Sequence, residues 1–120
     1  MIPITGTGAN TTVSESSLGI YLYDQWAWSE RTFGAGKRTL GIISHIRKEL
    51  EEIVDQPDDL SEWVDVMILA MDGYWRHGGL PQDLMGHLIA KQRKNFARTW
   101  PKQTSENEAI EHDRRLEAGI

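Results

Sequence analysis

Two helical segments on either side of Pro57 constrain the fold most. In residues 38–55, apolar side chains recur about every 3.6 residues, which is typical of an amphipathic helix with one face against a core. In residues 59–77, apolar side chains cover nearly the whole circumference, and Gly78 and Gly79 end the segment. Two neighbouring helices are therefore predicted, and the second is expected to be central in the fold.

Two further helices complete the predicted fold. Residues 18–32 are rich in apolar and aromatic side chains and are followed by a glycine-containing breaker at residues 33–36. Residues 81–97 begin with a proline, and Pro101 lies shortly after their end. The chain has no convincing strand pattern or internal repeat. We therefore expect an all-α bundle of four main helices with short connections.

The two ends of the chain are polar. Residues 1–17 offer too little apolar surface to offset the entropy of ordering them, so a flexible tail is expected. Residues 102–120 are expected to form a polar tail or a short helix. A single helical domain is thus predicted over residues 18–101.

Charge and composition exclude several functions. Acidic residues outnumber Lys and Arg by 18 to 13, so the basic surface that duplex nucleic acid requires is not expected. The longest uninterrupted apolar run, residues 66–71, is too short to span a membrane. The chain has no cysteine, which excludes disulfides and zinc-thiolate sites. Because residues 1–17 do not resemble a secretory signal, a cytoplasmic location is expected.

Acidic side chains lie at helical spacing within the two apolar segments. Glu49 and Glu52 border the apolar stripe of the first, and Glu62, Asp65 and Asp72 form the polar strip of the second. If these strips face each other, four or five carboxylates converge and repel one another unless a cation compensates them. Oxygen ligands without thiols suit Mg²⁺ or Mn²⁺. The pattern therefore predicts a divalent-metal site.

Several of these residues also have a structural interpretation. A single Glu-x-x-Glu pair is most often a solvated helix face, and Glu62 fits a capping box that begins at Asp58 or Asp59. Asp72 fits a functional or a structural role equally well. His45, beside the first acidic pair, fits a metal ligand or an orienting base, although such a histidine is more often hydrogen-bonded at the edge of a core.

Polar groups outside these segments suggest contacts to a phosphorylated substrate. Lys91, Asn95 and Arg98 share one strip of the last predicted helix, where they either grip a polyphosphate or form a solvated face. Residues 34–38, which include Arg38, either present backbone amides to an anion or form a plain loop. Their spacing is not that of a Walker motif.

Aromatic residues supply candidates for holding a base. The five tryptophans are mainly expected in the core or in interfaces. Aromatic stacking binds a base irrespective of its identity. Trp26 and Trp28 on the first predicted helix are the candidates for such stacking.

The acidic motifs resemble the signature of the MazG-like all-α nucleotide pyrophosphohydrolases. The pattern Glu49-Leu50-Glu51-Glu52 followed by Glu62-Trp63-Val64-Asp65 is similar to their ExxE…ExxD arrangement. Only nine residues lie between Glu52 and Glu62, fewer than in the broader superfamily, and this short connection resembles the phage dATP/dGTP diphosphohydrolase branch. The resemblance to that branch covers about residues 18–101. The segments on which this resemblance rests are residues 28–34, 45–50, 58–65 and 72–73.

The resemblance implies a metal site and a reaction. Glu49, Glu52, Glu62 and Asp65 would bind Mg²⁺, with Mn²⁺ as a possible substitute. Water would attack the α-phosphorus of a purine (d)NTP, with dGTP, GTP or dATP as the expected substrates, to give the monophosphate and pyrophosphate. Glu49 or Glu52 would accept the proton of the water. The residues expected to contact the substrate are Lys91, Asn95, Arg98, Asp72, Arg38 and Trp28.

The resemblance also bears on partners. Members of the family assemble as dimers or tetramers, so a homo-oligomer is expected. Phages that replace adenine with 2-aminoadenine use a dGTP- or GTP-hydrolysing member of this branch, and this chain is a candidate for such an enzyme. Two other functions remain open at this point: a non-catalytic helical interaction module, and a nucleotide sensor with negligible turnover.

Overall fold

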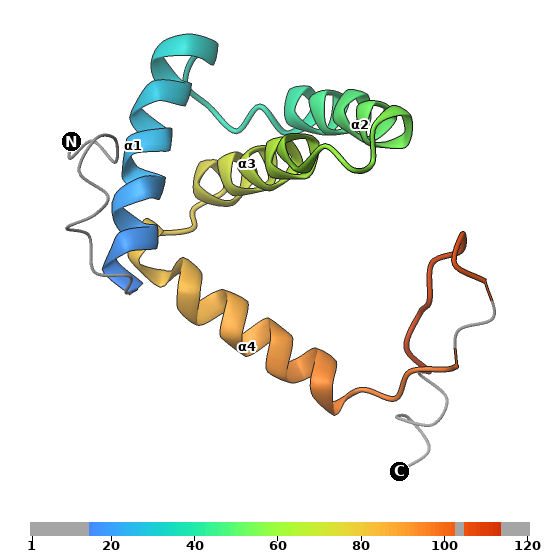
Figure 1. The fold of residues 1–120 in the computed structure, drawn as a ribbon. Helices are drawn as coiled ribbons and strands as arrows, with labels where there is room; N and C mark the ends of the chain where they lie inside the picture. Colours follow the sequence, from blue (N-terminus) through green and yellow to red (C-terminus); the bar gives the residue numbers. More distant parts are fainter. Residues whose placement is uncertain (1–14, 103–104, 114–120) are drawn as a thin grey trace. The chain divides into compact units, whose positions relative to one another are not determined.

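The computed structural model describes residues 15–102 and 105–113, and these residues form helices, turns and loops without a strand (Figure 1). The prediction of an all-α chain with four main helices is confirmed. A short 3₁₀ helix, η2, precedes the last of them. The elements are α1 (Glu15–Phe33), α2 (Thr39–Asp55), α3 (Leu60–Arg76), η2 (Pro81–Asp83) and α4 (Leu84–Ala97).

The predicted tails are only partly described. Helix α1 begins at Glu15, so the last residues of the expected N-terminal tail are helical, whereas residues 1–14 lie outside the described part. In the expected C-terminal tail, residues 105–113 form turns and irregular structure and no helix. Among the described residues, no helix combines the length and apolar content that crossing a bilayer requires.

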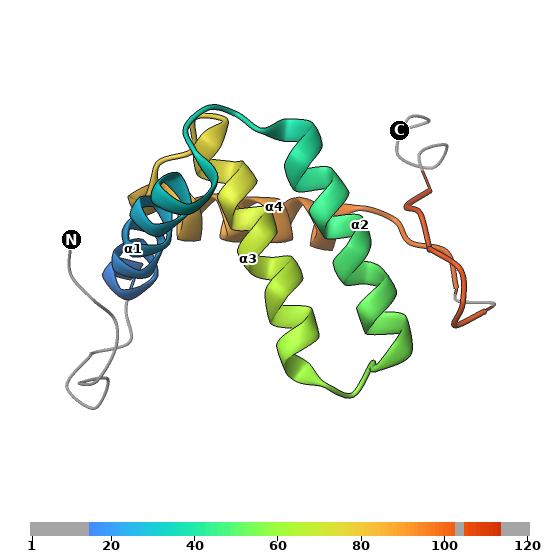
Figure 2. The same ribbon diagram turned by 90° about the horizontal axis from the view of Figure 1, so that it is seen from above.

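The chain divides into two compact units, residues 1–85 and residues 86–120. The first contains α1, α2, α3 and η2, and the second contains nearly all of α4. Each unit is described by itself. Within the first unit, α3 lies between α1 and α2, as Figure 2 shows.

Local sequence signals explain where the helices of the first unit begin and end. Gly34 and Gly78 adopt positive φ angles of 92° and 104° directly after α1 and shortly after α3, a conformation that glycine adopts without steric cost. At the start of α3, Oδ1 of Asp59 accepts a hydrogen bond from the Ser61 amide (3.0 Å), which confirms Asp59 as the N-cap. The Asp59 amide itself donates to the Gln56 carbonyl oxygen (3.1 Å). Glu62 therefore does not close the expected capping box.

A small aromatic core joins α1 to α3. Leu22, Trp75 and Leu84 are its buried members, and Trp26 stacks on Trp75 with ring centroids 4.7 Å apart. Such stacking adds to the free energy gained by burying the apolar rings. These contacts confirm that tryptophans serve partly as core residues.

The apolar surface of α2 and α3 is only partly buried. Helix α3 lies between two others, yet Met67 is 59% exposed, and on α2 Leu40 and Val54 are 82% and 79% exposed. Both α1 and α2 pack against α3, as its predicted central position requires, while part of its apolar surface stays exposed among the described residues of the first unit. An exposed apolar surface of this kind is typical of an interface.

Candidate active site

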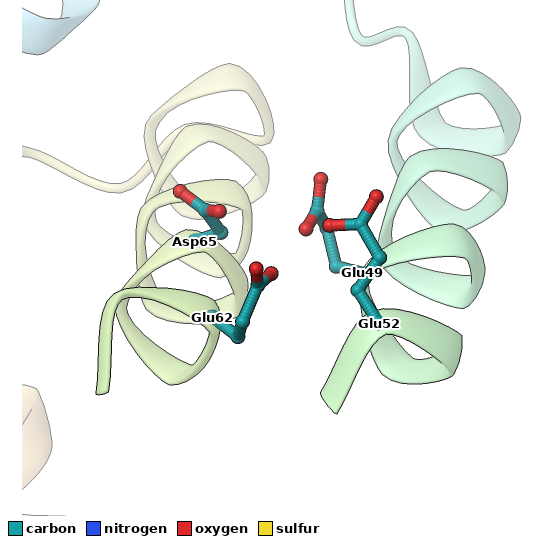
Figure 3. Close-up of side chains that lie close together, drawn as sticks. All are labelled: Glu49, Glu52, Glu62 and Asp65. Atoms are coloured by element: carbon teal, nitrogen blue, oxygen red, sulfur yellow. The ribbon is translucent and has the colours of Figure 1, made fainter. Parts of the chain in front are cut away.

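Four carboxylates converge between α2 and α3. Glu49 and Glu52 come from α2, and Glu62 and Asp65 come from α3 (Figure 3). One oxygen atom from each lies within 4.8 Å of the others. A spacing of three residues places each pair on one helix face, and the packing of α2 against α3 brings the two faces together. The expected meeting of the acidic strips is thus found, with four carboxylates and without Asp72. We call these four residues the carboxylate cluster.

The carboxylate cluster lacks cationic partners from the described part of the chain. Oε2 of Glu49 and Oε2 of Glu62 are buried and accept no hydrogen bond. One imidazole does contact the cluster: Nε2 of His45 lies 3.3 Å from Oε1 of Glu49. His45 therefore lies at the edge of the cluster, in contact with Glu49. Unpaired buried carboxylate oxygens are costly, so the cluster favours an external cation.

Mutual repulsion and burial raise the pKa values of two members. Hydrogen bonding to Glu52, followed by burial and the negative charges of Glu52, Asp59 and Asp65, raises the pKa of Glu62 to about 6. Burial, followed by hydrogen bonding to Glu52 and the charges of Glu52 and Asp65, raises the pKa of Glu49, which His45 partly offsets. Both shifts have the direction expected when like charges are held together without a counter-ion.

The donor atoms of the cluster fit hard divalent cations. All four ligands are carboxylate oxygens, which are the groups that bind Mg²⁺, Mn²⁺ and Ca²⁺ in proteins. Four carboxylates carry enough negative charge to balance more than one divalent ion. The residues present therefore fit a divalent-metal centre.

A cavity of about 510 Å³ adjoins the carboxylate cluster. Glu49 and Asp65 line it together with residues of α1 and the middle of α3, so the cluster opens into this space. The volume lies within the range of small-molecule sites. The cluster and the cavity therefore form one continuous site within the first unit.

Aromatic side chains form part of the cavity wall. Trp28 lines the cavity, is 48% exposed and contacts Phe33 edge to face, with ring centroids 5.5 Å apart. Trp26 packs against Trp75 and is not among the lining residues. Of the two tryptophans considered for stacking, Trp28 thus lies where a ligand can reach it.

A buried ion pair supports the same wall. The side chains of Asp72 and Arg76 are 6% and 0% exposed, and Nε of Arg76 lies 3.1 Å from Oδ1 of Asp72. Ser29 Oγ donates to that oxygen (2.7 Å), and Arg76 also donates to the carbonyl oxygens of Gly34 (2.9 Å) and Gly36 (2.8 Å). Asp72 therefore lines the cavity with its oxygens largely occupied, and Arg76 ties α3 to α1 and to the α1–α2 loop.

Sequence reasoning missed Arg76. The sequence signal for this residue was the Asp72/Arg76 spacing of four residues, which is the spacing of helical ion pairs.

Arg38, in the loop between α1 and α2, adopts a left-handed conformation with φ of 48°. Its guanidinium carbon lies 5.5 Å from the centre of the Phe33 ring, and it borders a smaller hollow beside the cavity. Its contact with a phosphate stays a prediction.

The expected phosphate-binding residues Lys91, Asn95 and Arg98, on α4 and just after it, belong to the second unit. Arg98 Nη1 donates to Asn95 Oδ1 (3.2 Å), and Lys91 is exposed. Lys91 and Asn95 lie on α4, and Arg98 directly follows its last residue, Ala97, where the Arg98 amide donates to the Asn95 carbonyl oxygen (3.3 Å). Their contact with a substrate stays a prediction.

A cluster of hard oxygen ligands beside a ligand-sized cavity in an all-α fold is typical of metal-dependent enzymes that act on phosphate compounds. A model of the dATP/dGTP pyrophosphohydrolase family matches residues 22–116, and the chain belongs to this family. A search of curated proteins found no match.

A solved structure supports the same assignment. The chain is similar to the cyanophage S-2L MazG-like pyrophosphohydrolase, described as bound to dGDP and three catalytic Mn²⁺ ions per active site. The TM-score is 0.60 and the sequence identity 25%, and the match covers 85% of this chain and 99% of the other. The protein is therefore a MazG-like nucleotide pyrophosphohydrolase.

Proposed function

We propose that this enzyme converts a purine deoxynucleoside triphosphate, dGTP or dATP, into the monophosphate and pyrophosphate with Mg²⁺ as the metal, and that GTP and Mn²⁺ serve as alternatives. The observation that carries the proposal is the convergence of four carboxylates at the edge of a cavity that contains an exposed tryptophan. The family description and the dGDP in the similar cyanophage structure support a purine substrate.

The carboxylate cluster would hold the metal ions through Glu49, Glu52, Glu62 and Asp65. When bound, divalent ions neutralise the triphosphate and lower the pKa of the attacking water. The water oxygen forms a bond to the α-phosphorus, the bond between this phosphorus and the bridging oxygen breaks, and pyrophosphate leaves. Glu49 or Glu52 accepts the proton of the water, since a general base must lie within hydrogen-bond reach of the nucleophile.

The remaining predicted residues bind the substrate in this proposal. Trp28 stacks on the base, because its ring is exposed in the cavity. Lys91, Asn95, Arg98 and Arg38 contact the phosphates, whose charge requires basic groups as well as metal ions. The bonds of Asp72 to Arg76 and Ser29 favour an indirect part for Asp72, in which it holds the cavity wall in place.

The replacement of Glu52 by Gln tests the reaction. Because loss of residues that merely support metal ligands costs 10- to 100-fold, loss of a ligand should lower pyrophosphate release by at least about 100-fold. Glu51→Gln is the matched control, since Glu51 is the neighbouring exposed acid outside the cluster. Both variants should keep the helical circular dichroism of the wild type.

The substrate panel for this experiment comprises the eight common (d)NTPs with Mg²⁺ or Mn²⁺, and the products are separated by chromatography. Monophosphate and pyrophosphate should appear with purine substrates. Undiminished turnover by Glu52→Gln would refute the assigned site. Binding of nucleotide with negligible steady-state release by the wild type would instead identify a sensor.

We also propose that the enzyme is a homodimer or homotetramer. Leu40, Val54 and Met67 are exposed on α2 and α3, and burial of such side chains against a second copy would remove apolar surface from water. Light scattering with size-exclusion chromatography gives the mass in solution. A mass near the 13.7 kDa of one chain at micromolar concentration would contradict this assembly.

A further inference from the structure

Asp24 is a cavity-lining carboxylate that the carboxylate cluster does not include. It lies on α1, on the wall of the cavity formed by that helix, whereas the cluster belongs to α2 and α3. In the described part of the chain, its carboxylate forms no ion pair and accepts no hydrogen bond. Arg31, two turns further along α1, also lines the cavity and forms no ion pair with it. Asp24 thus offers two acceptor oxygens to a ligand.

Two other polar side chains on the same wall, Gln25 and Ser29, already have partners. Gln25 accepts a hydrogen bond from Trp75 Nε1 (2.6 Å) and donates to Asp72 Oδ1 (3.3 Å). Ser29 donates to Asp72 (2.7 Å) and accepts from Arg76 Nη2 (2.9 Å). These groups are fixed by the protein. Of these three side chains, Asp24 is the one whose polar atoms are not occupied by other described residues.

The position of Asp24 relative to Trp28 indicates which part of a ligand it meets. The two residues are four apart on α1, and such residues lie on the same helix face with Cβ atoms about 6 Å apart. A base stacked on the exposed Trp28 ring extends in its own plane, so its edge reaches groups on the neighbouring turn. A carboxylate at that distance can accept hydrogen bonds from the edge of the base.

A carboxylate discriminates between the two purines. The Watson–Crick edge of guanine presents two adjacent donors, N1–H and the 2-amino group, which match two carboxylate oxygens. Adenine presents an acceptor, N1, beside its 6-amino donor, so one carboxylate oxygen would face a lone pair. An unmatched polar contact in a partly dry site is costly, and a well-placed bidentate pair discriminates between bases by about 1–3 kcal/mol.

We propose that Asp24 reads the Watson–Crick edge of the bound base and selects guanine over adenine, an inference that rests on the proposed function. The carboxylate contributes specificity at the end of the cavity wall formed by α1, and the carboxylate cluster contributes the chemistry. Of the two purines that the family description names, the preferred one for this chain is then guanine.

The replacement of Asp24 by Asn tests this role. The amide offers one acceptor and one donor, which match the 6-amino group and N1 of adenine. The ratio of kcat/KM for dGTP to that for dATP should therefore fall by about 10- to 100-fold. Asp24→Ala removes the carboxylate without adding a hydrogen-bond donor, so it should lower dGTP turnover without raising dATP turnover. Asp58→Asn, an exposed acid outside the cavity and the cluster, is the matched control.

Two further measurements separate base reading from loss of structure and from failure of the proposed reaction. With dITP, which lacks the 2-amino group, the wild type should lose activity relative to dGTP, and Asp24→Ala should show no such difference. The affinities for dGDP and dADP in Mn²⁺, measured by calorimetry, give the same ratio without turnover.

The outcomes are distinct. If the wild type hydrolyses dNTPs and Asp24→Asn keeps the wild-type preference, the role of Asp24 is refuted and the proposed function stands. If the wild type hydrolyses none but prefers dGDP to dADP in a manner that depends on Asp24, the base-reading role stands and the proposed reaction is refuted. A wild type without purine preference in either measurement overturns the inference.

Discussion

Two of the acidic side chains of helix α3, Asp65 and Asp72, lie about two turns apart in opposite electrostatic surroundings. Asp72 is buried against Arg76 and also accepts a hydrogen bond from Ser29. Asp65 faces three other carboxylates and no Lys or Arg from the described residues. A carboxylate whose counter-charge belongs to the chain is structural. A group of carboxylates without such an internal counter-charge depends on a cation from solution. Helix α3 provides both kinds of carboxylate.

The largest change in stability is expected when the internal cation, the guanidinium of Arg76, is removed. Arg76→Met leaves Asp72 buried without its partner and frees the carbonyl oxygens of Gly34 and Gly36. Breaking a buried ion pair from one side costs about 3–5 kcal/mol, so the free energy of unfolding should fall by that amount. Urea denaturation followed by circular dichroism measures it.

The double variant Asp72→Asn/Arg76→Met is the control for this prediction. It removes the uncompensated charge as well, so it should recover part of the lost stability. A loss below about 1 kcal/mol in Arg76→Met would mean that the pair contributes no more than a surface ion pair.

The second prediction separates the two aspartates by their response to metal. A ligand that binds only the folded state at 100 times its Kd stabilises by about 2.7 kcal/mol, so Mn²⁺ should raise the Tm of the wild type and EDTA should reverse the rise. Asp65→Asn should abolish most of this rise, whereas Asp72→Asn, the same chemical change on the same helix, should retain it. Equal responses in the two variants would remove the distinction between the two sites.

The smallest effect is expected from pH in the absence of metal. Hydrogen bonding to Glu52, burial and the charges of neighbouring acids raise the folded-state pKa of Glu62 from its ordinary value of 4.5 to about 6, so the folded protein holds this proton more tightly than the unfolded chain. The resulting stabilisation is fully present below about pH 4.5 and is lost as the pH rises through about 6. The Tm of the metal-free wild type should therefore decrease over this range relative to Glu62→Gln.

Saturating Mn²⁺ should reverse the sign of this dependence, because protons then compete with the metal for the carboxylates. Thermal melts of both proteins between pH 4.5 and 7, with and without the ion, measure it. Parallel curves for the wild type and Glu62→Gln would show that Glu62 is not perturbed.

The helices and the carboxylate cluster were predictable because they follow from local periodicity. The spacing of Glu49, Glu52, Glu62 and Asp65 places each pair on one helix face, and the turn around Pro57 makes the two helices neighbours. The partners of Asp72 were not predictable. Ser29 lies on α1, 43 residues away in sequence, and only the packing of α1 against α3 brings its hydroxyl to that carboxylate.

The sequence by itself determined the secondary structure, the absence of thiol ligands and the four acids that face one another. These properties depend on residue type and helical period, which act over a few residues. The tertiary structure decided which acid receives an internal cation, which tryptophan remains exposed in the cavity, and that Asp24 has no partner among the described residues. These outcomes depend on contacts between α1, α2 and α3, and no local pattern specifies which side chains meet across helices.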